Sequence, residues 1–186
     1  PTLERVIMSP FTQRSPDISN IPRCIDVHAL MSGYRPRIIE FERLPFNHPL
    51  YILYSSGTTG VPKCIVHGAG GTLLQHLKEH VLHVGLGRDD SLFYFTTLGW
   101  MMWNWEVTAL AASSTVLLYD GSPFARNGNI LFDFAEATGM SVMGTSAKFI
   151  DALAKAGLRP RETHNLEKLR AILSTGSPLV AFVQHR

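Results

Sequence analysis

The sequence predicts an α/β fold with a mostly parallel sheet flanked by helices. Short strand-like runs alternate with helix-like segments from residue 51 to residue 173, the order typical of a parallel sheet covered on both faces. The chain has 186 residues, of which 45% are hydrophobic, enough to bury a sizeable core as one domain. Loops at 55–63, 97–100 and 174–178 each follow a predicted strand. Because ligand sites of parallel sheets lie where strands end, we expect these loops to share one site.

The predicted elements follow from hydrophobic periodicity and from the residues that begin helices. Strands are expected at residues 3–8, 51–54, 64–66, 91–96, 115–119, 141–143 and 169–173. Helices are expected at residues 72–84, 99–112, 129–138 and 146–156. Thr72 and Ser146 are the expected caps of the first and last of these helices. The apolar face of the first helix is expected to contain Leu73, Leu74, Leu77, Val81 and Leu82. The stretch up to Pro22 is expected to be a loop, and residues 23–50 give no firm prediction.

Composition excludes several classes of protein. The net charge is +2 and only 17% of residues are charged, so no basic stripe points to nucleic acid as a partner. The longest apolar stretch, residues 107–118, is too short and too polar to span a membrane. Cys24 and Cys64 have no metal-type spacing and are expected to be free thiols. With no signal-peptide pattern at the start, these features indicate a soluble protein of the cytosol.

Residues 54–63 read Tyr-Ser-Ser-Gly-Thr-Thr-Gly-Val-Pro-Lys and follow a predicted strand. Glycines allow backbone N–H groups to approach an anion closely, hydroxyls add short donors, and a lysine adds a mobile cation. The predicted phosphate-binding residues are Ser55, Ser56, Gly57, Thr58, Thr59, Gly60 and Lys63. Two other kinds of loop are rich in glycine and serine. The loop at 55–63 does not fit the Walker A pattern, because Pro62 precedes the lysine, and a flexible serine–glycine linker would not normally join two strands and end in Pro-Lys.

Other clusters have simpler interpretations. His76, His80 and His83 lie at helical spacing, but no further ligand completes a metal site, so a solvated polar face is the favoured prediction. Trp103 and Trp105 are expected in the core, whereas Trp100, at the exit from a strand, is expected to line a pocket. The neighbouring pairs at 89–90 and 120–121 are expected to form turns.

With these residues in place, the chain resembles the adenylate-forming acyl-CoA synthetase family, and within it the ligases that act on acetoacetate. The resemblance rests on residues 54–80, 96–105, 117–123 and 172–179, and extends from about Val6 to Leu179. It implies that the chain is part of the large N-terminal domain of an adenylate-forming enzyme. It also implies a two-step reaction, in which ATP and a carboxylate give an acyl-adenylate and pyrophosphate, and coenzyme A then displaces AMP.

Site residues also follow from the resemblance. Lys63 and Thr58 are the implied catalytic residues within the phosphate loop 55–63. The acyl-pocket segment 96–105 includes Trp100, Met101 and Asn104, and an indole N–H or the Asn104 amide is a hypothetical donor to the 3-oxo group. The adenine-side turn contains Gly176, Ser177 and Pro178, although the family more often has an acidic residue where Ser177 stands. Mg²⁺ is implied only through the ATP oxygens, so no residue is assigned to a metal.

The family's magnesium segment, ribose-binding aspartate, hinge and small C-terminal domain have no counterpart in these residues, and the last seven residues do not resemble the family's continuation. An incomplete form of the ligase is therefore expected. Two alternatives remain open: a non-catalytic core that at most binds nucleotide weakly or pairs with another chain, and a synthetase for another short-chain carboxylic acid.

Overall fold

A computed structural model describes residues 2–55 and 60–179 of the protein. The chain forms two compact units, Pro1–Arg43 and Leu44–Arg186. In the first unit, β1 (Val6–Met8) pairs in parallel with β2 (Cys24–Asp26), and α1 (Val27–Ser32) follows directly. The Asp26 carboxylate accepts the backbone N–H groups of His28 and Ala29, which satisfies two donors at the start of this helix. The strand predicted at 3–8 is confirmed in shorter form, and β2 and α1 lie where the sequence gave no firm prediction.

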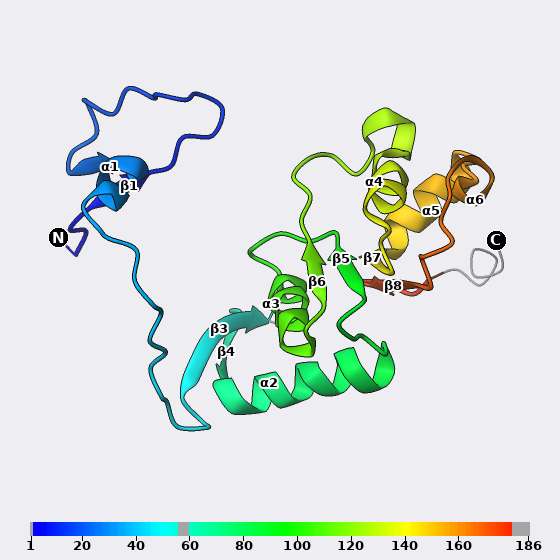
Figure 1. Cartoon of the computed structure of the whole chain (residues 1–186), viewed down its shortest axis with the longest axis horizontal. Helices are drawn as coiled ribbons and strands as arrows, with labels where there is room; N and C mark the ends of the chain where they lie inside the picture. Colours follow the sequence, from blue (N-terminus) through cyan, green and yellow to red (C-terminus); the bar gives the residue numbers. More distant parts are fainter. Residues whose placement is uncertain (1, 56–59, 180–186) are drawn as a thin grey trace. The chain divides into compact units, whose positions relative to one another are not determined.

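The second unit contains a parallel sheet in the strand order β6-β5-β7-β8 (Figure 1). Its strands are β5 (Ser91–Tyr94), β6 (Thr115–Leu117), β7 (Val142–Ser146) and β8 (Ala171–Thr175). All three neighbouring pairs are parallel. The predicted α/β fold with a parallel sheet flanked by helices is confirmed, with strand boundaries displaced by a few residues.

Two hydrophobic clusters cover the two faces of this sheet. Side chains of a strand alternate between faces, so Phe93 and Met143 enter one cluster while Leu92 and Val142 enter the other. The first cluster is closed by α4 (Ile130–Thr138) and α5 (Ala147–Lys155). The second is closed by α3 (Met101–Val107) and the 3₁₀ turn η2 (Thr108–Ala112). Figure 1 shows the two helical groups on opposite sides of the sheet.

The remaining helical segments connect these layers. They are α2 (Ala69–Leu77), the π-helical η1 (Lys78–His83), the 3₁₀ turn η3 (Ala125–Gly128) and α6 (Pro160–Thr163). The predicted cap Ser146 is confirmed, since its hydroxyl accepts the N–H of Phe149. The predicted cap Thr72 is wrong: α2 begins after Gly68, and Thr72 lies inside the helix. In the part of the chain that the structure covers, no helix combines the length and the hydrophobicity needed to cross a bilayer.

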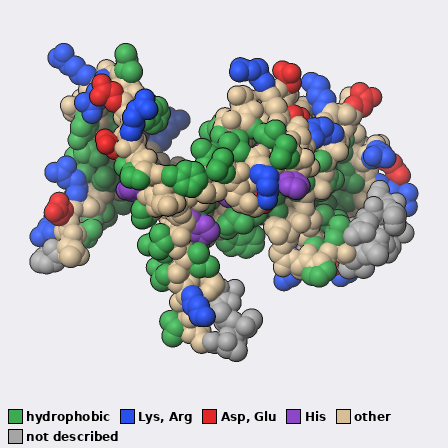
Figure 2. Space-filling model, turned by 90° about the horizontal axis from the view of Figure 1, so that it is seen from below, with side chains coloured by type: hydrophobic (Ala, Val, Ile, Leu, Met, Phe, Trp, Pro, Cys, Tyr) green, Lys and Arg blue, Asp and Glu red, His purple; other side chains and the backbone are tan. Residues whose placement is uncertain are grey.

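The hydroxyl-rich loop belongs to a separate sheet. Strands β3 (Pro49–Ser55) and β4 (Lys63–Gly68) form an antiparallel hairpin of two strands. The expectation that the 55–63 loop leaves the same parallel sheet as the other two loops is therefore wrong, because a short turn between strands favours antiparallel pairing. The hairpin extends from the rest of its unit as an arm (Figure 2).

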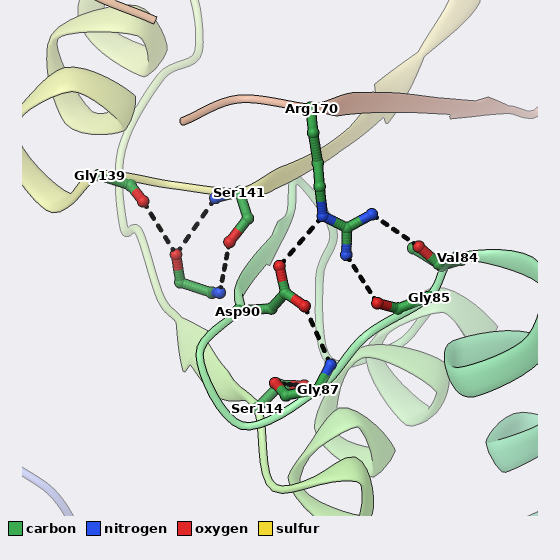
Figure 3. Close-up of polar contacts among 9 residues, drawn as sticks. Val84, Gly85, Gly87, Asp90, Ser114, Gly139, Ser141 and Arg170 are labelled. Atoms are coloured by element: carbon green, nitrogen blue, oxygen red, sulfur yellow. Dashed lines mark hydrogen bonds and ion pairs between the residues drawn. The ribbon is translucent and has the colours of Figure 1, made fainter. Parts of the chain in front are cut away.

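Polar contacts join the amino-terminal ends of the parallel strands (Figure 3). Arg170, next to β8, donates to a carboxylate oxygen of Asp90 and to the carbonyl oxygens of Val84 and Gly85. The other oxygen of Asp90 accepts the N–H of Gly87, which confirms a turn at this position. These contacts join the start of β8 to the loop before β5, at the edge opposite to the one from which the predicted loops 97–100 and 174–178 leave.

Candidate active site

The hairpin brings the two ends of the predicted phosphate loop together. Ser55, the last residue of β3, pairs with Lys63, the first residue of β4, and the Ser55 hydroxyl accepts the Lys63 N–H at 3.3 Å. The Lys63 side chain is exposed. Gly60 has a φ of +115°, a conformation that favours glycine. The prediction that this loop joins two strands is confirmed.

Four residues of the predicted loop, Ser56, Gly57, Thr58 and Thr59, lie outside the described residues. Their assignment to phosphate binding, and the catalytic role given to Thr58 and Lys63, therefore stay predictions.

The predicted acyl-pocket segment leaves the carboxyl end of β5. The N–H of Trp100 donates to the carbonyl of Thr97, and this turn precedes the first residue of α3. Trp100 and Met101 are 59% and 48% exposed, so both side chains are accessible at this edge. Asn104 is half-buried one turn further along the helix. A role of these three residues in binding an acyl group stays a prediction.

The predicted adenine-side turn leaves the carboxyl end of β8. Gly176 has a φ of +91° and directly follows the strand. Ser177 and Pro178 are exposed. Only β7 lies between β5 and β8, so the strand ends before Trp100 and Gly176 are two strand spacings apart, about 10 Å. Two of the three predicted loops thus leave the same edge of one sheet.

Two cavities in the second unit lie elsewhere. One, of about 320 Å³, lies between the C-terminal end of α4 and residues 165–169. The other, of about 230 Å³, is lined by Arg126, Asn129, Asp133, Thr163 and His164. Among the residues that the structure describes, no predicted site residue lines either cavity.

The histidines of α2 and η1 correct the sequence-based prediction. His76 and His80 are 7% and 0% exposed, so the predicted solvated face is wrong for both. The Thr108 hydroxyl lies 3.0 Å from His76 Nδ1 and 3.0 Å from His80 Nε2. His80 Nε2 also lies 2.9 Å from the Trp105 carbonyl oxygen. The buried stripe of this helix therefore runs through its histidines, while Leu73 and Leu74 of the predicted apolar face are exposed.

The environment of the two histidines shifts their pKa values. Burial lowers the pKa of His76 and of His80, because water no longer stabilises the charged ring. In the described parts of the chain, no three His, Cys, Asp or Glu side chains gather in a way that could bind a metal ion. Trp105, predicted in the core, is buried and donates its indole N–H to Glu79 at 2.8 Å. Trp103 is half-buried.

A buried carboxyl group, which the sequence analysis does not predict, directly follows the predicted acyl-pocket segment 96–105. Glu106 of α3 is 2% exposed and accepts the N–H of Tyr94, the last residue of β5, at 2.7 Å. Burial raises the pKa of Glu106 to about 7, and the Tyr94 N–H partly opposes this effect. The sequence does contain a signal for this group. Glu106 lies in a helix rich in tryptophan and methionine, and an acidic residue between core positions needs a hydrogen-bond partner.

Comparison with known proteins adds independent information. The sequence matches the AMP-binding enzyme family over residues 19–186. Acetoacetyl-coenzyme A synthetase of Rhizobium meliloti (strain 1021) is 63% identical over 149 residues, covering 80% of this chain and 23% of that protein. Acetoacetyl-CoA synthetase of Gallus gallus is 52% identical over 184 residues, covering 96% and 28%. The solved acetoacetyl-CoA synthetase of Streptomyces lividans aligns with a TM-score of 0.84 at 40% identity, covering 99% and 28%. The chain spans about a quarter of the length of these curated relatives.

Proposed function

We propose, because the chain belongs to the AMP-binding enzyme family, that its function is ATP-dependent ligation of acetoacetate to coenzyme A. The observation that carries this proposal is the 63% identity over 149 residues to an acetoacetyl-coenzyme A synthetase. An alignment over 149 of the 186 residues spans the segments 54–80 and 96–105.

The proposed reaction has two steps. A carboxylate oxygen of acetoacetate attacks the α-phosphorus of ATP, and pyrophosphate leaves with the electrons of the broken P–O bond. The thiol of coenzyme A, losing its proton, then attacks the acyl carbon of the adenylate, and AMP leaves. Neither step requires a nucleophile from the protein, so the protein contributes positioning and stabilisation of charge.

The proposed roles divide among the three loops. The hairpin residues Ser55–Lys63 bind the β- and γ-phosphates, with Lys63 and Thr58 stabilising the charge that develops on pyrophosphate. Gly176, Ser177 and Pro178 lie against adenine. Trp100, Met101 and Asn104 contact the acyl group, and the half-buried Asn104 amide donates to its 3-oxo oxygen. The position of Lys63 supports the first role. Its side chain is exposed, and it pairs with Ser55 in the last pair of the hairpin before the loop.

The proposed cofactors and partners are small molecules: ATP, acetoacetate and coenzyme A. Mg²⁺ would be bound through the phosphate oxygens of ATP. We place the protein in the cytosol, since Cys24 and Cys64 are free thiols, as is typical of a reducing compartment.

Isotope exchange between ATP and pyrophosphate tests the first step. The purified protein is assayed with acetoacetate, acetate and butyrate, and without acid. Exchange that depends on acetoacetate supports the proposal. Exchange with another acid alone would instead indicate a different short-chain synthetase, and ATP binding without exchange would indicate a non-catalytic nucleotide-binding core.

The variant Lys63→Ala tests the phosphate role. Two unit charges 4 Å apart interact by about 4 kcal/mol at an effective dielectric constant near 20, so losing the ammonium group should slow exchange at least about tenfold. The matched control is Lys168→Ala, which removes an exposed lysine at the amino-terminal side of β8. Equal exchange rates in Lys63→Ala and native protein would contradict the assignment of Lys63.

A further inference from the structure

Glu106 connects α3 to the last residue of β5. Its carboxyl oxygen lies 2.7 Å from the Tyr94 nitrogen, and its side chain is almost fully buried. The turn that begins after Tyr94 leads to Trp100, the residue that precedes α3. The contact therefore joins the residue before the segment 95–100 to the helix that follows this segment.

The sheet explains why an acceptor is required here. Successive N–H groups of a strand point to opposite sides, and the N–H of Phe95 donates to Gly144 of β7. The N–H of Tyr94 therefore points toward β6. The last pair between these strands joins Phe93 to Leu117, where β6 ends. Glu106 supplies the acceptor that a longer β6 would have supplied.

A carboxyl group is an unusual choice for this purpose. A neutral amide could accept the same hydrogen bond without the cost of burying a charge. Burial instead raises the pKa of Glu106 to about 7, so its charge changes near neutral pH. Ionisation leaves a buried negative charge with one N–H donor. The Tyr94 N–H stabilises this charge in part, but burial opposes it more strongly, so ionisation favours local opening toward water.

We propose that Glu106 is a positioning residue for the candidate acyl pocket, and that its protonation controls how firmly the 95–100 turn is held against α3. The neutral form keeps the turn closed, and ionisation loosens it. The assignment of this turn to an acyl pocket rests on the proposed function, whereas the coupling of Glu106 to the turn rests on the contact with Tyr94.

Other titratable groups around α3 are distinguishable from Glu106. From β5, Tyr94 stays neutral, because burial raises the pKa of its phenol to about 12. From α2 and η1, His76, His80 and Glu79 lie against Thr108 and Trp105. Burial lowers the pKa of both histidines, so they change charge at lower pH than Glu106 does.

Tryptophan fluorescence gives a selective readout of this region. The three tryptophans of the chain, Trp100, Trp103 and Trp105, all lie in α3 or directly before it. We expect a fluorescence transition near pH 7 in the native protein that Glu106→Gln abolishes, because glutamine accepts the same hydrogen bond but does not ionise. Glu167→Gln, at an exposed glutamate, is the matched control and should retain the transition.

Amide hydrogen exchange at Tyr94 tests the contact itself. Exchange in the native protein should accelerate at least about threefold between pH 6 and pH 8, beyond the intrinsic pH dependence of exchange. Glu106→Gln should remove this excess, and Glu106→Leu, which lacks the acceptor, should exchange at least about tenfold faster than Glu106→Gln at every pH. If Glu106→Leu fails to fold, the comparison of native protein with Glu106→Gln decides alone.

The functional consequence is a change in the pH dependence of the KM for acetoacetate. In the native protein this KM should rise about threefold or more from pH 6 to pH 8, while the KM for ATP stays constant, and Glu106→Gln should flatten the profile. A purely structural role would lower activity equally at each pH. Absence of acetoacetate-dependent exchange in the native protein would refute the proposed function, while fluorescence and hydrogen exchange would still decide the role of Glu106. Identical pH profiles for native protein and Glu106→Gln would overturn the inference.

Discussion

Replacing Arg170 with methionine should destabilise the second unit without acting directly on the candidate site. The guanidinium group donates Nε–H to Asp90 at 3.1 Å and contacts the carbonyl oxygens of Val84 and Gly85 at 2.8 and 3.0 Å (Figure 3). These partners lie before β5, and Arg170 lies before β8, so the side chain joins the starts of two strands separated by β7. Methionine keeps much of the aliphatic stem but none of the donors.

The magnitude follows from the number and exposure of the lost contacts. Hydrogen bonds to charged groups are each worth about 1.5–3 kcal/mol when well shielded, and exposed ion pairs about 0–1 kcal/mol. The Arg170 and Asp90 side chains are 40% and 19% exposed, so we take the lower end, about 1.5 kcal/mol, for each of the two carbonyl contacts and at most about 1 kcal/mol for the ion pair. Arg170→Met should lower the free energy of unfolding by about 3–4 kcal/mol. A double-mutant cycle with Asp90→Asn should give a coupling of about 1 kcal/mol.

The pH dependence gives a second measurement of the same contact. The side-chain hydrogen bond from Arg170 is the main cause that lowers the pKa of Asp90, and the Gly87 N–H adds to it. A carboxyl group with a lowered pKa in the folded state stabilises the protein above its unfolded pKa of about 3.9, and this contribution disappears as the pH falls through the folded pKa. Arg170→Met should therefore flatten the acid limb of the stability curve.

Urea unfolding followed by far-ultraviolet circular dichroism measures these quantities. Arg161→Met removes an exposed arginine of α6 and serves as the control, with an expected change within about 0.5 kcal/mol. Additive effects of Arg170→Met and Asp90→Asn, within about 0.3 kcal/mol, would refute the reasoning, as would an unchanged acid limb.

Three further changes test the packing around the sheet. Burial lowers the pKa of His80, so the native protein loses stability as the pH falls below about 6.5. In His80→Gln this loss should be smaller, because glutamine does not titrate. Urea unfolding at pH 7 and pH 5 measures the difference. Gly144→Ala should cost about 3 kcal/mol or more, since a methyl group there would overlap the ring of Tyr94, whereas Gly87→Ala meets open space and should cost less than about 1 kcal/mol in the same assay. Leu131→Ala removes a fully buried core side chain and should lower the free energy of unfolding by about 2–5 kcal/mol.

The parallel sheet and its helices could be predicted because their signal is local. Strands β5, β6 and β7 contribute alternate residues to the two clusters, and helix α5 has a clear cap, Ser146. The two strands of the antiparallel hairpin are predicted from the sequence, but their sheet is not, because periodicity identifies strands and not their partners. The first unit was missed in part, since strands of three residues carry too little pattern.

The buried face of helix 69–83 could not be predicted from hydropathy. Leu73 and Leu74 are more apolar than His76 and His80, yet the histidines are buried. Their burial depends on Thr108 and Trp105, which supply hydrogen-bond partners from about 30 residues away. Glu106 was missed for a related reason: its role depends on where β6 ends, which no local pattern of α3 records.

The candidate site is predictable in part because the contacts that stabilise the parallel sheet and the turns of the candidate site lie at opposite ends of its strands. At one edge, Asp90 and Arg170 fix the starts of the strands. At the other edge, the turns that carry Trp100 and Gly176 are exposed. Because strand spacing is a constant of the backbone, the order β5-β7-β8 places the strand ends that precede these turns about 10 Å apart without knowledge of any side chain. The contact between Glu106 and Tyr94 lies next to the turn that carries Trp100, so mutations at Glu106 should alter the site, whereas mutations at Arg170 should mainly change the stability of the sheet.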